Sequence, residues 1–153
     1  MQTDLIKPFL NSTLHVLKTM AFTEASPGKP FMKTDAKAKG DVSGVIGLTG
    51  DNEGSLSISF TAQCICKIVS NMFGEEITEV NHEVEDAVGE ITNMISGDAR
   101  RVLEEKGVVL KSAIPTVISG PGHHVSHITT GPCVAIPFST EGGDFTLEIC
   151  LAH

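Results

Sequence analysis

The sequence predicts an α/β fold of the α+β type, in which long helices pack on a mainly antiparallel sheet. Two long segments carry apolar residues at the 3–4 spacing of an amphipathic helix. Two others alternate apolar and polar residues on both sides of a turn cluster, as β-hairpins do. The order helix, extended piece, hairpin occurs twice, which suggests two similar halves that build one sheet.

Length and charge limit the possible functions. The chain has 153 residues, of which 41% are hydrophobic, so we expect one compact domain over residues 1–153. A net charge of −8 argues against binding to nucleic acid or to anionic membranes, which need a basic face. The sequence shows no signal peptide and no apolar run of about 18 residues, so a cytoplasmic protein is expected.

The first predicted helix spans about residues 7–22, with Pro8 in its first turn, where a missing N–H is tolerated. The breaker cluster at residues 26–30 ends this helix, and Phe31–Lys33 is expected to be extended.

The first hairpin is predicted at residues 42–49 and 55–60, on either side of a turn rich in glycine and acidic residues. Its second strand alternates strictly, so we expect the apolar side chains to face the core and the serines to face outward. The inward residues would be Leu56, Ile58 and Phe60, and the outward ones Ser55, Ser57 and Ser59.

Helical spacing returns at residues 62–73, and Gly74 is expected to end that helix. A longer helix is predicted from about residue 82 to residue 106, with Asn81 as its N-cap and Gly107 closing it.

The last third of the chain is predicted to be mostly extended. Residues 108–119 contain Pro115, which is typical of an edge or bulged strand. A loop rich in glycine and histidine follows, and residues 134–138 and 145–151 predict the second hairpin.

The four cysteines are too few and too scattered for a disulfide scaffold. We interpret all of them as unpaired small hydrophobic residues in or near the core: Cys64, Cys66, Cys133 and Cys150.

Asp86, Glu90 and Asn93 are spaced by four and three residues within the long helix, so they fall on one face together with Gly97. We call these four residues the polar face; it points well away from the apolar stripe. Solvation is the simplest explanation of such a face. However, Asn is a poor residue for an exposed helix interior, and Gly89 and Gly97 each cost about 1 kcal/mol relative to Ala. Three unfavourable choices in one helix hint at a use.

The residues around this face resemble the CheC/CheX/FliY family of chemotaxis response-regulator phosphatases, and the CheX branch most. The family signature is an Asp or Ser, a Glu four residues later, an Asn three residues after that, and a more distant Pro. Here these positions match Asp86, Glu90, Asn93 and Pro115. Further similar segments, which extend the match over almost the whole chain, are GDVSGVIGLTGD, GEEITEVNHEVEDAVGEITNMISG, IPTV and GHHVSH.

The resemblance implies a CheC/CheX-like fold and hydrolysis of the aspartyl phosphate on a CheY-type response regulator. It assigns catalytic roles to two residues: Asn93 would orient the attacking water, and Glu90 would pair with the active-site lysine of the partner. Asp86, Gly89 and Gly97 would support the face and permit close approach. The protein would need no cofactor or metal of its own, because Mg²⁺ would be held by the response regulator.

The resemblance also implies one active site per chain and a homodimer. Family members with two sites carry the signature twice, whereas here the first helix offers Asn11 with Pro8 in place of the glutamate. The CheX branch, which has one site, forms dimers that join sheets across subunits.

Two rival functions stay open. One is a non-catalytic scaffold of the same fold that only binds a response regulator. The other is a metal-dependent enzyme that uses the loop histidines His123, His124 and His127, although no Cys, Asp or Glu adjoins them in sequence. For this loop, a plain polar connection is the preferred interpretation.

Overall fold

The computed structural model describes residues 2–33, 38, 40–120, 122–123 and 133–151. Within these residues, three helices pack against one eight-stranded sheet in which all strand pairs are antiparallel. The predicted fold class is therefore confirmed. The helices are α1 (Gln2–Ala21), α2 (Ala62–Phe73) and α3 (His82–Glu105). The strands are β1 (Ala25–Pro27), β2 (Phe31–Lys33), β3 (Val42–Gly50), β4 (Gly54–Phe60), β5 (Leu110–Ser112), β6 (Thr116–Ser119), β7 (Cys133–Thr140) and β8 (Gly143–Leu151).

The strand order shows how the two halves of the chain combine. The sheet runs β1-β7-β8-β4-β3-β5, with β2 also paired to β7 and β6 also paired to β3. The short strands of the first half, β1 and β2, thus pair with β7 in the hairpin of the second half. The short strands of the second half, β5 and β6, pair with β3 in the hairpin of the first half. This is the arrangement expected of two similar halves that build one sheet.

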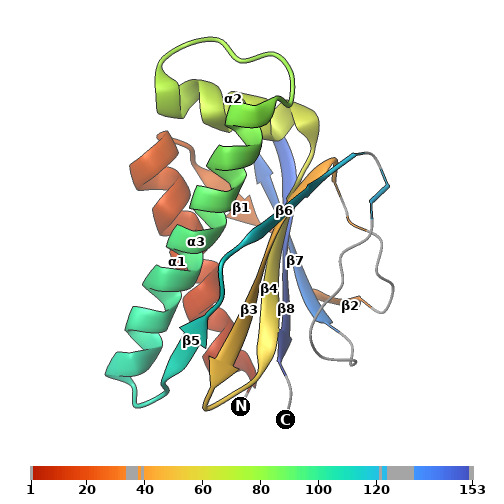
Figure 1. Cartoon of the computed structure of the whole chain (residues 1–153). Helices are drawn as coiled ribbons and strands as arrows, with labels where there is room; N and C mark the ends of the chain where they lie inside the picture. The colour runs from red at the N-terminus through yellow and green to blue at the C-terminus, as the bar shows by residue number, and fades with distance from the viewer. Residues whose placement is uncertain (1, 34–37, 39, 121, 124–132, 152–153) are drawn as a thin grey trace.

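The helices lie on one face of the sheet. In Figure 1, α1 and α3 run side by side in opposite directions along that face, and α2 lies across its upper end. Between the helices and the sheet lies the apolar core, which includes Phe9 of α1, Ile65 of α2, Ile91 of α3 and Ile58 of β4. The two faces of α3 therefore differ: one is packed on the sheet and the other is presented outward.

Three segments differ in detail from the prediction. Helix α1 begins at Gln2, so Pro8 lies inside it. Burial of Leu5 and Phe9 on either side offsets the hydrogen bond that Pro8 cannot make. Strand β1 was not expected, because its sequence reads as a turn; as an edge strand it accommodates Pro27. Residues 108–119 form two strands rather than one, and both lie at the edge of the sheet that Pro115 predicted.

The serines of β4 do not face water. Ser55, Ser57 and Ser59 are buried, so this part of the second face of the sheet is not exposed to water. The hydroxyl of Ser59 lies 2.6 Å from that of Ser43, which lies 2.6 Å from Nε2 of His123. The prediction assumed that one face of the sheet is exposed to solvent. Tertiary packing buries these serines instead.

The cysteine interpretation is half right. All four cysteines are buried, but Cys133 and Cys150 form a disulfide between β7 and β8. Their Cα atoms are 4.4 Å apart at the end of the paired register. Cys64 and Cys66 are free thiols. The pairing depends on strand register, which the cysteine count could not provide.

Candidate functional site

Local sequence fixes the position of helix α3. The side chain of Asn81 accepts a hydrogen bond of 3.0 Å from the N–H of Val84, which caps the helix as predicted. Glu83 and Glu85 lie in the first turn, where the helix dipole favours anions. The buried stripe of α3 packs against the sheet. This packing holds in place the helix backbone that carries the outward side chains.

The polar face lies where the helical spacing predicted. Asp86, Glu90 and Asn93 are exposed along one side of α3, and Gly97 is half-buried at its lower end. The side chains of Asp86, Glu90 and Asn93 form no hydrogen bond or ion pair with any other residue that the structure describes. Two carboxylates and an amide are therefore available to a partner.

Strand β6 runs beside α3 and approaches the polar face. The hydroxyl of Ser119 donates a hydrogen bond of 2.6 Å to Glu85, and a methyl group on Gly89 would lie 3.4 Å from Cγ2 of Val117. Strand β6 therefore packs along α3 on the side of Glu85 and Gly89.

The two glycines of this helix have different surroundings. Gly89 is half-buried against β6, so its missing side chain lets the strand approach. At Gly97 the nearest atom to an added methyl group would be Nη2 of Arg100, at 3.9 Å. Among the described residues, nothing would therefore obstruct a methyl group at Gly97.

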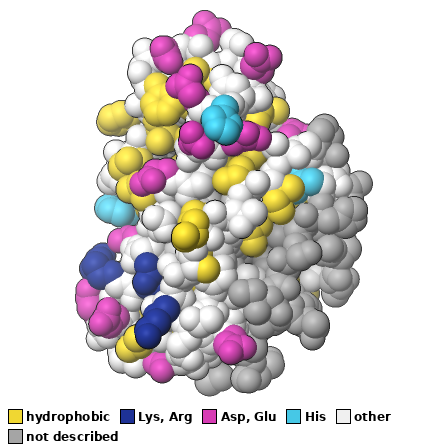
Figure 2. All heavy atoms as spheres, viewed as in Figure 1, with side chains coloured by type: hydrophobic (Ala, Val, Ile, Leu, Met, Phe, Trp, Pro, Cys, Tyr) yellow, Lys and Arg dark blue, Asp and Glu magenta, His cyan; other side chains and the backbone are white. Residues whose placement is uncertain are grey.

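The charge around the polar face is predominantly negative. Residues 68–99 include eight acidic residues and no lysine or arginine. Figure 2 shows several acidic side chains on the upper part of the molecule, over the connection between α2 and α3, and the lysines and arginines farther down with other acidic side chains beside them. A partner that meets this surface is favoured when it presents positive charge.

A hollow lies directly beside the polar face. It has a volume of about 410 Å³ and is lined by Met72 and Phe73 at the end of α2 and by four residues of α3. The four are Glu83, Asp86, Ala87 and Glu90. We call it the α2–α3 hollow. This hollow could not be predicted from the sequence, because it depends on how α2 packs against α3.

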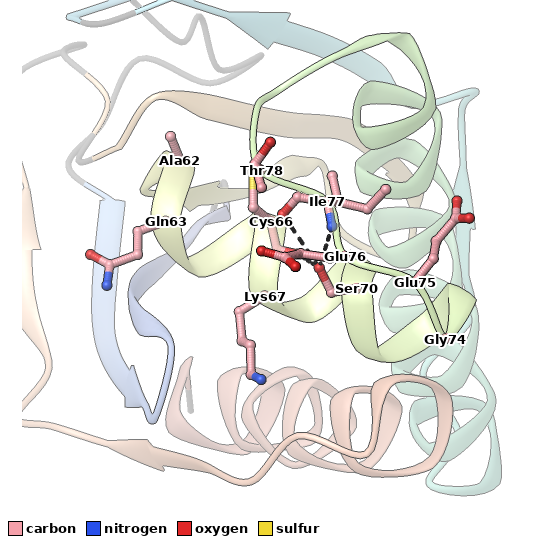
Figure 3. A pocket seen from close by; sticks show the side chains of 10 residues that line it. All are labelled: Ala62, Gln63, Cys66, Lys67, Ser70, Gly74, Glu75, Glu76, Ile77 and Thr78. Carbon is pink, nitrogen blue, oxygen red and sulfur yellow. Dashed lines mark hydrogen bonds between the residues drawn. The ribbon is translucent and has the colours of Figure 1, made fainter.

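A larger hollow, of about 820 Å³, lies on the other side of α2 and includes neither Glu90 nor Asn93. Figure 3 shows its lining, where the hydroxyl of Ser70 contacts the backbone N–H and C=O of Ile77. These bonds hold the connection after α2 in place. This hollow is separate from the polar face, because no residue of that face lines it.

The free thiols do not supply a nucleophile. Burial raises the pKa of Cys64 from 9.0 to about 11, although its hydrogen bond with Thr140 partly opposes this. Burial, with a smaller contribution from the charge of Glu79, also raises the pKa of Cys66. Both groups therefore stay protonated near neutral pH, and a thiol is a poor nucleophile.

The histidine loop lies mostly outside the described residues, which include His123 but neither His124 nor His127. Both ring nitrogens of His123 are engaged: Nδ1 donates to the carbonyl of Gly120 at 2.7 Å, and Nε2 lies 2.6 Å from Ser43. The described residues contain no group of three or more potential metal ligands. His123 therefore serves to hold its segment on the sheet.

Across the described ranges, no helix is long and apolar enough to cross a membrane. The cytoplasmic location expected from the sequence stays a prediction.

Comparison with known proteins gives consistent matches. The family model for the chemotaxis phosphatase CheX matches residues 42–139. The CheY-P phosphatase CheX of Thermotoga maritima is 29% identical over 153 residues, which is 97% of each chain.

Two solved structures extend the likeness to three dimensions. A chemotaxis protein CheX from Desulfovibrio desulfuricans is 48% identical, with a TM-score of 0.89 over 97% of this chain and 99% of that one. A complex of CheX with CheY, BeF₃ and Mg²⁺ from Borrelia burgdorferi contains a chain that is 29% identical, with a TM-score of 0.82 over 97% of both chains.

Proposed function

The chain belongs to the chemotaxis phosphatase CheX family, and from this membership we propose that it hydrolyses the aspartyl phosphate of a CheY-type response regulator. In the related complex, the CheX chain is bound to CheY with BeF₃ and Mg²⁺. BeF₃ stands in for the phosphoryl group on the aspartate. The same kind of partner, in its phosphorylated state, is the substrate that we assign to this protein.

The reaction breaks one P–O bond. Water attacks the phosphorus atom, the aspartate carboxylate leaves, and the products are inorganic phosphate and the unmodified response regulator. An acyl phosphate already has a good leaving group, so the main task is to hold water in line with the bond that breaks. Mg²⁺ belongs to the partner and offsets the charge of the phosphoryl oxygens.

The residues of the polar face suit that task. Asn93 is exposed and makes no side-chain bond to another described residue, so its amide is free to donate to and accept from a water molecule. An amide needs no change of protonation state for this role. Glu90 lies three residues away on the same face and would pair with the active-site lysine of the response regulator. That ion pair would fix the position of Asn93 relative to the phosphorylated aspartate.

The observation that carries this proposal is the exposed pair Glu90 and Asn93 on a rigid helix, within a family match that spans the site. One catalytic centre per chain is proposed, since α1 carries Pro8 and Asn11 where α3 carries Glu90 and Asn93. Asp86 is proposed to contribute to binding rather than to the chemistry. The homodimer and the single domain over residues 1–153 stay predictions.

The test is phosphate release from a phosphorylated CheY-type receiver, measured with catalytic amounts of this protein. We expect the wild type to accelerate release, and Asn93→Ala to abolish the acceleration while still binding the receiver. Glu90→Ala should lose activity chiefly through weaker binding. No acceleration by the wild type, or full activity of Asn93→Ala, would overturn the catalytic assignment.

The non-catalytic scaffold is separated from this proposal by the same assay. A scaffold would bind the beryllofluoride-loaded receiver and leave its rate of dephosphorylation unchanged. The metal-dependent enzyme has less support, because both nitrogens of His123 already hold hydrogen bonds within the protein. Metal analysis of the purified protein tests it directly.

A further inference from the structure

We propose that the α2–α3 hollow binds an arginine or lysine side chain on the surface of the response regulator, as a second anchor beside Glu90. This inference rests on the proposed function and names the part of the surface that selects the partner. It assigns binding roles to Phe73, Asp86 and Glu83, which are distinct from the catalytic role of Asn93.

The hollow is continuous with the proposed catalytic surface. Asp86 and Glu90 belong to both, because each lies on the polar face and also lines the hollow. A receiver whose phosphorylated aspartate reaches Asn93 therefore covers the hollow as well. Whatever the receiver presents there is buried on binding.

One wall of the hollow is apolar. Phe73, a large aromatic residue at the end of α2, is 46% exposed. Gly74 caps that helix in the left-handed conformation, with its N–H 2.9 Å from the carbonyl of Ser70. The Ser70 side chain also holds the N–H of Ile77 at 2.9 Å. A pre-positioned exposed aromatic is typical of binding hot spots.

The other wall is anionic. Glu83, Asp86 and Glu90 follow one another at three and four residues, so their carboxylates line one side of α3. Among the described residues, none of these three forms an ion pair. The carbonyl end of α2 adds the negative end of its dipole at the same place. The nearest lysine and arginine in sequence are Lys67 and Arg100, outside this stretch, while His82, directly before Glu83, lies 3.6 Å from Glu85.

An arginine or lysine matches both walls. Its aliphatic stem packs on apolar surface while its charged end stays near carboxylates, and a cation over the face of Phe73 gains further attraction. A purely apolar side chain would fill the wall formed by Met72 and Phe73 but would desolvate Asp86 without a partner. The combination therefore favours a cationic side chain with a long stem.

The experiment measures binding to a CheY-type receiver loaded with beryllofluoride and Mg²⁺, which requires no turnover. Phe73→Ala should raise the dissociation constant about tenfold, as truncation of a hot-spot aromatic does. Asp86→Asn and Glu83→Gln should each raise it several-fold and reduce its dependence on salt, because a screened charge pair is lost. The matched control is Val109→Ala, which truncates a side chain of equal exposure, 46%, beyond the far end of α3.

A kinetic measurement separates binding from chemistry. In phosphate release, Phe73→Ala should raise the half-saturating receiver concentration about tenfold and change the rate at saturation less than twofold. Substituting each surface arginine and lysine of the receiver should then find one whose effect is not additive with Asp86→Asn in a double-mutant cycle.

Unchanged dissociation constants for folded Phe73→Ala and Asp86→Asn would overturn the inference. Weaker binding by Phe73→Ala with unchanged salt dependence in Asp86→Asn would also overturn it, since the occupant would then be an apolar side chain. Failure of the proposed function looks different: the wild type would bind the receiver without accelerating phosphate release. Thermal melts of each variant exclude unfolding as the cause.

Discussion

Gly44 of β3 lies so close to Thr92 of α3 that no methyl group fits between them. A Cβ atom at residue 44 would overlap the Thr92 hydroxyl and lie 3.3 Å from Cγ1 of Val88. That hydroxyl donates a hydrogen bond of 2.7 Å to the carbonyl of Val88. Because Thr92 directly precedes Asn93, this contact sets how far the polar face stands from the sheet.

Replacement of Gly44 by alanine should therefore affect both stability and activity. Overpacking at such a site costs about 1–3 kcal/mol of unfolding free energy, and relief by moving α3 would displace Asn93. We expect a lower melting temperature and slower phosphate release. The double variant Gly44→Ala/Thr92→Ala should recover part of both. Equal effects in the single and double variants would show that Thr92 is not the obstacle.

Gly97→Ala should stabilise the protein and weaken its binding to the receiver. The nearest atom to the new methyl group is 3.9 Å away, and alanine in a helix interior is favoured over glycine by about 1 kcal/mol. The melting temperature should rise. If Gly97 keeps the surface low for a partner, binding to the beryllofluoride-loaded receiver should weaken in the same variant. Tighter or unchanged binding would remove Gly97 from the proposed interface.

Asn93→Asp tests the water-orienting role with almost no change in shape. The carboxylate cannot donate a hydrogen bond and brings negative charge to the phosphoryl oxygens. The rate of phosphate release should fall at least about 100-fold, a loss comparable to removing a catalytic polar group. The melting temperature should stay close to that of the wild type, because Asn93 is exposed and makes no side-chain bond to another described residue. A small loss of rate would contradict the mechanism.

The ion pair of Lys33 and Glu148 is expected to matter for stability rather than function. Their charged atoms lie 3.3 Å apart, and both side chains are at most 2% exposed. Lys33→Met should lower the unfolding free energy by about 3 kcal/mol, because a buried carboxylate loses its cation. The double variant Lys33→Met/Glu148→Leu should cost less than the single one in denaturant titrations. A larger loss of unfolding free energy in the double variant than in the single one would mean that the ion pair stabilises the fold by more than the desolvation of its two charges costs.

Thiol chemistry checks the cysteine assignment. In denaturant without reductant, two thiols should react, from Cys64 and Cys66, and four should react after reduction. In the native protein, Cys64 should resist alkylation at pH 8, because with a pKa of about 11 only about one thiol in a thousand is ionised. Its reactivity should rise as the pH approaches that value. Four reactive thiols before reduction would exclude the disulfide.

The parts of this fold that follow local rules could be predicted from the sequence. The cap formed by Asn81, the stop at Gly74 and both hairpins depend on neighbouring residues only, and all are found in the structure. Burial of Ser57 and pairing of Cys133 with Cys150 depend on segments far away in sequence, so neither could be predicted. Strand β1 was hidden because Pro27 suits a turn as well as an edge strand.

The candidate site shows the same division. The shared face of Glu90 and Asn93 follows from helical spacing alone. The hollow beside them requires Phe73, which comes from another helix, and its position depends on how α2 and α3 pack. The roles of Glu90 and Asn93 rest on family resemblance, because exposed polar residues on a helix are ordinary by themselves.

The exchange of strands between the halves makes each half depend on the other. Strands β1 and β2 need β7, while β5 and β6 need β3, so a chain cut between α2 and α3 would leave two fragments with unpaired edges. Each half of the chain thus completes the sheet of the other, although only α3 carries the glutamate and asparagine together; α1 has Pro8 and Asn11 instead.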